Sequence, residues 1–332
     1  MTWMLTGGAG YIGAHVLRAL HEAGERVVVL DDLSTGDPGR LPAGVPLILA
    51  SVLDGRRITQ ALREHEVDGV IHLAGKKAVE ESVRFPLRYY HENAEGVRTL
   101  LQAMADAGTR RLVFSSSAAV YGVPTTALVG EDAPATPQSP YGRSKLVGEW
   151  MVADAARSQG VGAVSLRYFN VVGCATPALA DRAGSNLFPR VLDALREGRR
   201  PTVFGSDYPT PDGSGVRDYI HVADLAEAHV AATRITARMA ERGGHEVLNV
   251  GCGHGYSVLE VLRAFAEVTG LDTTPLVLPR RPGDAGSVVA DPSRAQAVLG
   301  WAARHDLADM VTSAWEAELV MRASLAATAT SA

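Results

Sequence analysis

The sequence predicts an α/β protein in which a doubly wound parallel sheet forms the larger part and a smaller α/β lobe follows it. Three observations lead to this prediction. In the first half, short apolar runs alternate with amphipathic stretches, which is typical of strand–helix units that build a parallel sheet. A glycine-rich turn joins the first apolar run to the first amphipathic stretch. After about Asn170 the alternation becomes irregular.

The apolar runs are short enough to be strands, and the amphipathic stretches between them are long enough to be helices. Val27-Val28-Val29-Leu30 is continuously apolar, as expected for a parallel strand that is buried on both faces. The predicted strands are Thr2–Thr6, Arg26–Leu30, Val45–Leu49, Gly69–Leu73, Arg111–Phe114 and Ala163–Arg167. The predicted helices are Ile12–Ala23, Gly55–His65, Leu87–Ala107, Tyr141–Gln159, Asn186–Glu197, Leu259–Thr269 and Leu307–Arg322.

The chain has 332 residues, which is too long for one small core. We expect residues 1–170 to form the sheet domain, with segments of about 216–250 returning to it. Residues 171–322 are expected to form mainly the smaller lobe, and Gly173–Ser185 is predicted to be a loop. The tail 323–332 has little to bury, so we expect it to be disordered.

Composition excludes several classes of protein. The net charge is -5 and the sequence has no run rich in lysine and arginine, so nucleic acid or an anionic membrane is not expected as a partner. Two cysteines cannot build a disulfide framework or a zinc site, and no metal site is predicted. There is no signal-peptide pattern and no run of ~18 apolar residues. We therefore expect a soluble, cytoplasmic protein.

The glycine-rich turn indicates a dinucleotide site in a Rossmann-type sheet. Gly7, Gly10 and Gly13 have the G-x-x-G-x-x-G spacing, and Tyr11 and Ile12 lie within it. Glycines permit a tight turn, let the backbone approach a pyrophosphate, and let the following helix pack closely on the strand.

Asp31 ends the second predicted strand. A carboxylate at this position accepts hydrogen bonds from the ribose hydroxyls and repels a 2′-phosphate. The sequence therefore predicts NAD rather than NADP.

Tyr141 and Lys145 are four residues apart in a predicted helix that Ser139 can cap and Pro140 can begin. They therefore lie on one helix face. A positive charge at ~4 Å in an effective dielectric of ~20 is worth ~4 kcal/mol, or ~3 pKa units, so Lys145 is expected to bring the phenol close to neutrality. Ser117 ends the strand run Leu112–Ser117, at the edge where open α/β sheets bind ligands.

With these residues in view, the sequence resembles the extended short-chain dehydrogenase/reductase family, and within it the UDP-galactose 4-epimerases. The resemblance runs from about residue 2 to about residue 320. The stretches that carry it are Thr6–Gly13, His72–Val79, Pro137–Lys145, Leu166–Asn170, Phe204–Val222 and Arg280–Asp284.

The resemblance implies the following roles. Tyr141 would be the base, Lys145 would bind the nicotinamide ribose, and Ser117 would bond the sugar 4′-oxygen. The implied NAD contacts are Gly7, Gly10, Tyr11, Ile12, Gly13, Asp31, Ser51, Val52, Leu73, Ala74, Gly75, Lys77, Asn93, Ser115, Tyr141, Lys145 and Phe169. The implied UDP-sugar contacts are Lys77, Ser117, Tyr141, Asn170, Asn186, Leu187, Phe204, Arg217, Tyr219, Arg281, Asp284 and Val288.

Three positions depart from the family pattern. Ala50-Ser51 replaces the usual Gly-Asp after the third strand, so the adenine amino group would meet a hydroxyl. Glu92 and Glu95 replace amides and leave Asn93 as the candidate polar contact on its helix. After Asp284 the sequence has no tyrosine beside the sugar, and Val288 takes that place.

The resemblance implies interconversion of UDP-glucose and UDP-galactose through a 4-keto sugar with tightly bound NAD, in a homodimer formed by the helices Leu87–Ala107 and Tyr141–Gln159. UDP-N-acetylglucosamine, UDP-pentose and UDP-uronate stay open as substrates. A 4,6-dehydratase is an alternative, but it needs an acid–base pair where Ala118-Ala119 stands. A non-catalytic NAD-sensing protein is a further alternative that Ser117, Tyr141 and Lys145 disfavour.

Overall fold

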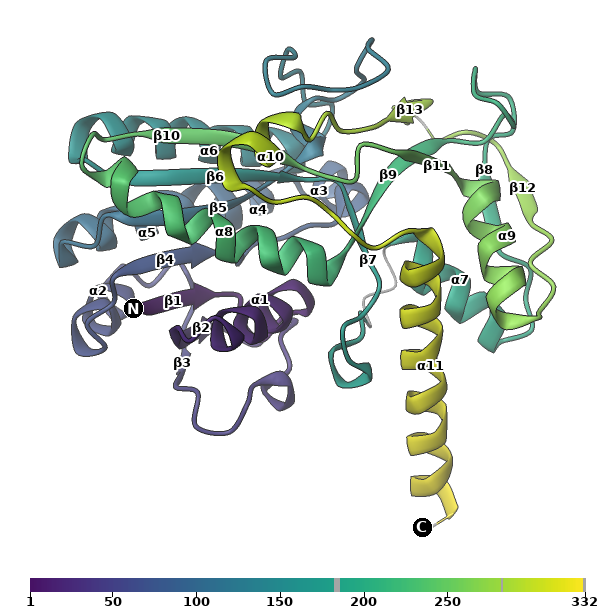
Figure 1. The fold of residues 1–332 in the computed structure, drawn as a ribbon, viewed down its shortest axis with the longest axis horizontal. Helices are drawn as coiled ribbons and strands as arrows, with labels where there is room; N and C mark the ends of the chain where they lie inside the picture. Colours follow the sequence, from purple (N-terminus) through teal and green to yellow (C-terminus); the bar gives the residue numbers. More distant parts are fainter. Residues whose placement is uncertain (182–185, 282, 331–332) are drawn as a thin grey trace.

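A computed structural model describes residues 1–181, 186–281 and 283–330 of the chain. Its main feature is a parallel sheet of seven strands in the described chain, in the order β10-β6-β5-β4-β1-β2-β3 (Figure 1). The strands are β1 (Thr2–Thr6), β2 (Arg26–Asp31), β3 (Leu47–Leu49), β4 (Gly69–His72), β5 (Arg111–Ser117), β6 (Gly162–Tyr168) and β10 (His245–Val250). This confirms the predicted fold class.

Helices cover both faces of this sheet (Figure 1). α1 (Tyr11–Glu22) and α8 (Val222–Ala240) pack on one face, where Leu17 and Leu225 share a core with Val29 and Val164. The other face carries α2 (Gly55–Glu64), α5 (Gly96–Ala107) and α6 (Pro140–Gln159), and its core includes Ile58. Continuous apolar strands are therefore buried from both sides, as their sequence predicts.

The strand order reverses beside β1, because β2 and β4 flank it and the later strands continue on the β4 side. At such a switch point the loops after neighbouring strands diverge and leave a crevice outside the carboxyl ends of the strands. The glycine turn after β1, Asp31 at the end of β2 and Ser117 at the end of β5 all lie at this edge.

The predicted helix Leu87–Ala107 is not one continuous helix. A short helix α3 (Val79–Arg84) precedes α4 (Pro86–Tyr89), and a π-helical segment, Tyr90–Glu95, separates α4 from α5. A π turn holds one residue more than an α turn and is frequent at functional sites. Here it contains Asn93, which is buried.

The second half of the chain builds smaller sheets beside the large one (Figure 1). β7 (Asn170–Val172), β9 (Val216–His221), β11 (Gly255–Ser257) and β13 (Ser287–Val288) form one sheet, and β8 (Thr202–Phe204) pairs with β12 (Leu276–Leu278). The remaining helices are α7 (Leu187–Arg196), α9 (Val258–Thr269), α10 (Ser293–Leu299) and α11 (Leu307–Thr330). Residues 182–185 of the predicted loop lie outside the described residues.

Several elements of this half pack into the large sheet layer, among them α8, α10 and the edge strand β10, which pairs with β6. The helix expected to end at Arg322 continues to Thr330. Half of the added residues are alanine, which has the highest helix propensity, so the tail predicted to be disordered is helical up to that point. Of the helices described, none combines the length and apolar character needed to span a bilayer.

Five histidines of the described chain are buried or nearly so, and burial is the main cause that lowers their pKa. The pKa falls to about 4 for His15, His221, His229 and His245, and to about 3 for His72. The unfolded chain would bind these protons near pH 6.5 and the folded chain would not. Folding stability is therefore lost as the pH falls from about 6.5 to about 4.

We predict that the melting temperature falls between pH 7 and pH 5. One pKa unit corresponds to about 1.4 kcal/mol, so the total loss is on the order of several kcal/mol. The raised pKa of Asp218, about 6, acts in the opposite direction but is a single group. Thermal melts should show a shallower pH dependence for His229→Gln than for the wild type, whereas His65→Gln, at the end of α2, should keep the wild-type slope. Equal melting temperatures at both pH values would contradict the prediction.

Candidate active site

The glycine turn is held tightly between β1 and α1. Gly7 has a left-handed backbone, with φ of 73°, and its N–H donates to the Leu30 carbonyl over 2.8 Å. A Cβ at Gly13 would lie 2.2 Å from the Gly7 carbonyl oxygen, so only glycine permits this approach of helix and turn. The N-cap of α1 is Gly10, which has no side chain to bond the first N–H groups of the helix. These groups can therefore bind an anion.

Asp31 lies directly behind this turn. Its carboxylate accepts the Ala9 N–H over 3.0 Å and the Leu33 N–H over 2.9 Å. Burial raises the pKa of Asp31, and the two backbone hydrogen bonds act against that rise. Each carboxylate oxygen keeps acceptor capacity for a further donor, as binding of ribose hydroxyls requires.

Tyr141, Lys145 and Ser117 come together as predicted at the edge of the sheet. Ser139 caps α6 by accepting the Gly142 N–H over 3.1 Å, and Pro140 begins the helix. Ser117 ends β5 and its hydroxyl bonds the Tyr141 phenol. The Lys145 ammonium lies 6.0 Å from the centre of the Tyr141 ring.

The electrostatics differ from the prediction made for Tyr141. Burial raises the pKa of this tyrosine, and the hydrogen bond from Ser117 lowers it in part. Lys145 donates instead to the Ser115 carbonyl over 2.9 Å, and burial lowers its own pKa to about 8. The expected lowering of the Tyr141 pKa by Lys145 alone is therefore absent from this structure, in which the ammonium is bonded to the strand.

Asn93 holds the loop that follows β4. Its amide oxygen accepts the Lys76 N–H over 2.8 Å, and its amide nitrogen donates to the Lys76 carbonyl and to the Ser144 hydroxyl, both over 3.0 Å. A Cβ at Gly75 would lie 2.9 Å from the amide oxygen. Asn93 thus fixes the path of residues 73–77, which were predicted to contact the cofactor.

The other predicted cofactor contacts surround the same edge. Ser51 and Val52 follow β3, and the Ser51 hydroxyl accepts the Leu53 N–H over 3.2 Å. The Tyr11 hydroxyl donates to the Gly173 carbonyl over 2.7 Å, so this group is engaged by the protein. The residues Ile12, Leu73, Ala74 and Ser115 are half-buried or buried, Phe169 is buried between β6 and β7, and Lys77 is exposed.

The predicted substrate contacts come from the smaller sheets. Asn170 of β7 lies opposite Tyr219 of β9, and their side chains are hydrogen-bonded. Val288 of β13 lies opposite Arg217 of β9. The Arg217 guanidinium is 3.9 Å from the Asp284 carboxylate.

Two further groups complete this set of predicted substrate contacts. The guanidinium of Arg281 lies 3.8 Å from the centre of the Phe204 ring. Asn186 and Leu187 stand at the start of α7, where the Asn186 amide donates to Asp181 over 3.3 Å. Pro282, between Arg281 and Asp284, lies outside the described residues.

Contacts join the predicted substrate residues of the smaller sheets to the residues at the edge of the large sheet. Val288 packs against an apolar cluster that contains Phe169, Val120 and Leu146, next to the end of β5. Across the loop after β4, the Glu80 carboxylate lies 3.5 Å from the Arg281 guanidinium. The smaller sheets therefore face the carboxyl edge of the large sheet, where Tyr141 stands.

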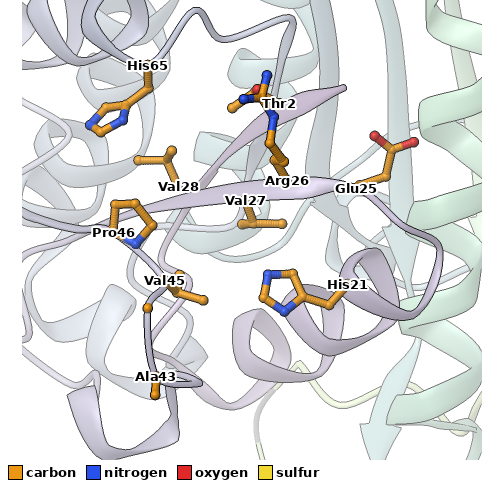
Figure 2. A pocket seen from close by; sticks show the side chains of 11 residues that line it. Thr2, His21, Glu25, Arg26, Val27, Val28, Ala43, Val45, Pro46 and His65 are labelled. Atoms are coloured by element: carbon orange, nitrogen blue, oxygen red, sulfur yellow. The ribbon is translucent and has the colours of Figure 1, made fainter.

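A cavity of about 390 Å³ opens at the opposite edge of the large sheet (Figure 2). The side chains around it include Thr2, Arg26, Val45 and His65. Of the described residues that line it, none is a predicted site residue. Within residues 1–181, 186–281 and 283–330, no group of three His, Cys, Asp or Glu side chains is placed to hold a metal ion.

Sequence reasoning missed Glu149, Arg167 and Ser116, which are buried directly behind Tyr141 and Lys145. The sequence does contain a pattern that indicates Glu149, because this residue follows Lys145 by four positions and thus lies on the same helix face. Arg167 likewise interrupts an apolar strand that is otherwise suited to complete burial.

The fold and this site define a nucleotide-dependent enzyme of the Rossmann type, and sequence comparison gives the family. The NAD dependent epimerase/dehydratase family model matches residues 3–251, and the chain belongs to this family. It is 46% identical over 325 residues to the UDP-glucose 4-epimerase of Azospirillum brasilense, covering 95% of this chain and 92% of that protein.

Solved structures agree with this assignment. A UDP-glucose 4-epimerase from Stenotrophomonas maltophila, with bound NAD and formylated UDP-arabinopyranose, superposes with a TM-score of 0.92 at 42% identity, over 98% of this chain and 99% of that one. The UDP-Glc/GlcNAc 4-epimerase from Campylobacter jejuni has a TM-score of 0.82 at 34% identity, over 96% of this chain and 99% of its own.

We predict that the purified protein carries NAD and that Gly13→Ala loses it. An added Cβ would meet the Gly7 carbonyl oxygen at 2.2 Å and push α1 away from the turn. Denaturing each protein and measuring the released nucleotide by mass spectrometry tests this. Gly130→Ala is the control, since a Cβ there meets nothing within 4 Å. Release of NADP instead of NAD, or full NAD content in Gly13→Ala, would contradict the role of the turn.

Proposed function

We propose that the chain is a UDP-hexose 4-epimerase that interconverts UDP-glucose and UDP-galactose through a 4-keto sugar, with NAD held tightly. The observation that carries this proposal is that Ser117, Tyr141 and Lys145 meet at the edge of the sheet that also carries the glycine turn and Asp31. Relatives along almost the whole chain, such as the one in Azospirillum brasilense, are UDP-glucose 4-epimerases.

The residues present fit NAD. The close approach at Gly7 and Gly13 forms a cradle that any side chain would fill, and Asp31 behind it has spare acceptor capacity. Lys145 is buried at the other end of this edge, where it can donate to ribose hydroxyls. When bound, NAD supplies the hydride acceptor and donor for C4, and a positive charge that lowers the pKa of a nearby phenol.

Tyr141 takes the proton of the sugar 4′-hydroxyl and later returns it, while Ser117 holds the 4′-oxygen. Because the same residue takes and returns the proton, the cycle leaves the protein unchanged. Arg217 and Arg281 suit the diphosphate in charge and in geometry, and Asn170 and Asn186 offer amides to the rest of UDP. We propose that the domain of residues 1–170 holds NAD and that the lobe of residues 171–322 holds UDP as a handle while the sugar turns.

We also propose that the enzyme acts in the cytoplasm as a homodimer. Both cysteines are free thiols, as in a reducing compartment. Apolar side chains are exposed on α3, α4 and α6, and among them Leu87 is 80% exposed and Trp150 is 60% exposed. An apolar patch on helices of this kind is suited to burial against a second copy.

A second substrate is favoured by Val288. This residue packs against the apolar cluster that contains Phe169 and Val120, and a larger tyrosine at this position would take up space on the substrate side of the site. The related protein from Campylobacter jejuni is a UDP-Glc/GlcNAc 4-epimerase. A dehydratase is disfavoured because Ala118 and Ala119 have no acidic or basic groups to act at C5 and C6.

We predict that Tyr141→Phe lowers turnover by about 10²–10⁴-fold, since it removes the general base. Wild type, Tyr141→Phe and the control Tyr90→Phe would be incubated with UDP-glucose, and UDP-galactose and any dehydrated product measured. The control and the melting temperature of Tyr141→Phe should match the wild type. Wild-type turnover by Tyr141→Phe would exclude it as the base, and loss of water from the sugar would indicate a dehydratase.

We predict that the wild type also epimerises UDP-N-acetylglucosamine and that Val288→Tyr suppresses this reaction selectively. A steric clash with the acetyl group rejects the larger sugar, whereas simple loss of a contact would cost about 1–3 kcal/mol. The measurement is kcat/KM for both sugars with both proteins, so UDP-glucose is the internal control. Undetectable turnover of the N-acetyl sugar by the wild type would show that Val288 does not set the size limit.

A further inference from the structure

One face of α6 carries Tyr141, Lys145 and Glu149 at intervals of four residues. Lys145 is 6% exposed and Glu149 is 4% exposed, so two ionisable groups of opposite charge are buried one helical turn apart. A buried carboxylate is costly unless it is paired and hydrogen-bonded. The partners of Glu149 therefore indicate what it does.

The last three residues of β5 each bond this helix face. The Ser115 carbonyl accepts from the Lys145 ammonium over 2.9 Å, and the Ser117 hydroxyl bonds Tyr141. Between them, the Ser116 hydroxyl donates to the Glu149 carboxylate over 2.5 Å. Glu149 therefore fixes the strand at the residue that precedes Ser117.

The same carboxylate also binds β6. Arg167 donates to it twice, from Nε over 2.9 Å and from a terminal nitrogen over 2.7 Å. The other terminal nitrogen of Arg167 donates to the Tyr121 hydroxyl over 2.8 Å, and Tyr121 donates to Asn249 over 2.6 Å. Because Tyr121 follows the turn after Ser117, the network fixes both sides of this serine.

Glu149 also bears on the charge of Lys145. Burial disfavours the ammonium, and the Glu149 carboxylate is the charge that opposes the fall in its pKa. The other groups that face the pair are His72 of β4, whose pKa is about 3, His245 of β10, whose pKa is about 4, and Tyr141 and Arg167. Both histidines are neutral at pH 7, and Arg167 is cationic. None of these three groups can therefore supply the negative charge that would be lost with the Glu149 carboxylate.

We propose that Glu149 is a positioning residue of the epimerase, an inference that rests on the proposed function. Its carboxylate fixes Ser116 and Arg167 against α6, which places Ser117 at Tyr141, and its negative charge lies one helical turn from the Lys145 ammonium. Glu149 acts through these groups without contact with the sugar or the cofactor.

The first measurement reads the charge of Lys145 without using activity. The chain has three lysines, Lys76, Lys77 and Lys145, so carbon-13 labelling at the lysine side chain gives few signals, and Lys145→Arg identifies the one of interest. We expect the Lys145 signal to titrate near pH 8 in the wild type. In Glu149→Gln its midpoint should fall by about two pH units, the size of one charge ~6 Å away in an effective dielectric of ~20.

The second measurement is the pH profile of kcat with UDP-glucose. In Glu149→Gln the alkaline limb of this profile should move to lower pH by the same amount as the Lys145 midpoint, with KM and bound NAD near wild type. Glu149→Asp keeps the charge but has a shorter side chain. The alkaline limb should therefore stay at the wild-type pH, and kcat should fall. Ser116→Ala should lower kcat by about 3–10-fold with no shift of Lys145. Glu318→Gln is the matched control, because Glu318 is also buried and pairs with an arginine, Arg322, over 2.9 Å on α11.

A wild-type Lys145 midpoint in Glu149→Gln, or wild-type kcat in both Glu149→Asp and Ser116→Ala, would overturn the proposal. If Glu149→Gln does not fold, Glu149→Leu with Arg167→Met replaces the ion pair by apolar groups, a change that folds commonly tolerate, and its Lys145 midpoint must fall too. Failure of wild-type protein to epimerise UDP-glucose would reject the proposed function instead, and the Lys145 titration would still decide the role of Glu149.

Discussion

Burial of charge where β5 meets α6 constrains much of this molecule. An ammonium in an apolar layer is stable only beside acceptors, and Lys145 obtains a carbonyl from Ser115 and an opposing charge from Glu149. The carboxylate in turn needs donors, which Ser116 and Arg167 supply. Ser115 and Ser116 lie on β5 and Arg167 lies on β6, so the register of both strands against the helix is fixed by polar bonds as well as by apolar packing.

The sheet and its chemistry could be read from the sequence because they depend on local patterns. Apolar runs such as Val27–Leu30 define buried strands, and the spacing of Tyr141 and Lys145 defines a helix face. The position of the ammonium could not be predicted, because its distance from the phenol depends on the carbonyl of Ser115 in another element. The π turn around Asn93 was also missed, and the bonds of the Asn93 amide to the backbone of Lys76, 17 residues away, are contacts that no local pattern predicts.

The second half was harder to predict for a physical reason. Its strands are two to six residues long and pair across large sequence separations, as when Val288 pairs with Arg217. Short strands have little periodicity of their own, and tertiary contacts decide where they form. The polar side chains on them are nevertheless brought to one region, because β7, β9 and β13 are neighbours in one sheet.

The placement of the three lysines has a practical consequence. Lys76 and Lys77 lie on the loop after β4, and Lys145 lies on α6, so all three lysines are at the reacting edge. Reagents that acylate amines would find the exposed Lys77 and the half-buried Lys76 here, and the N-terminus, where Met1 pairs with Glu25. Attachment to a solid support through amines would therefore bind the enzyme to the support at the edge of the sheet that carries the active site. Linkage through carboxylates on the distant face of α2, such as Glu64, would leave that edge open.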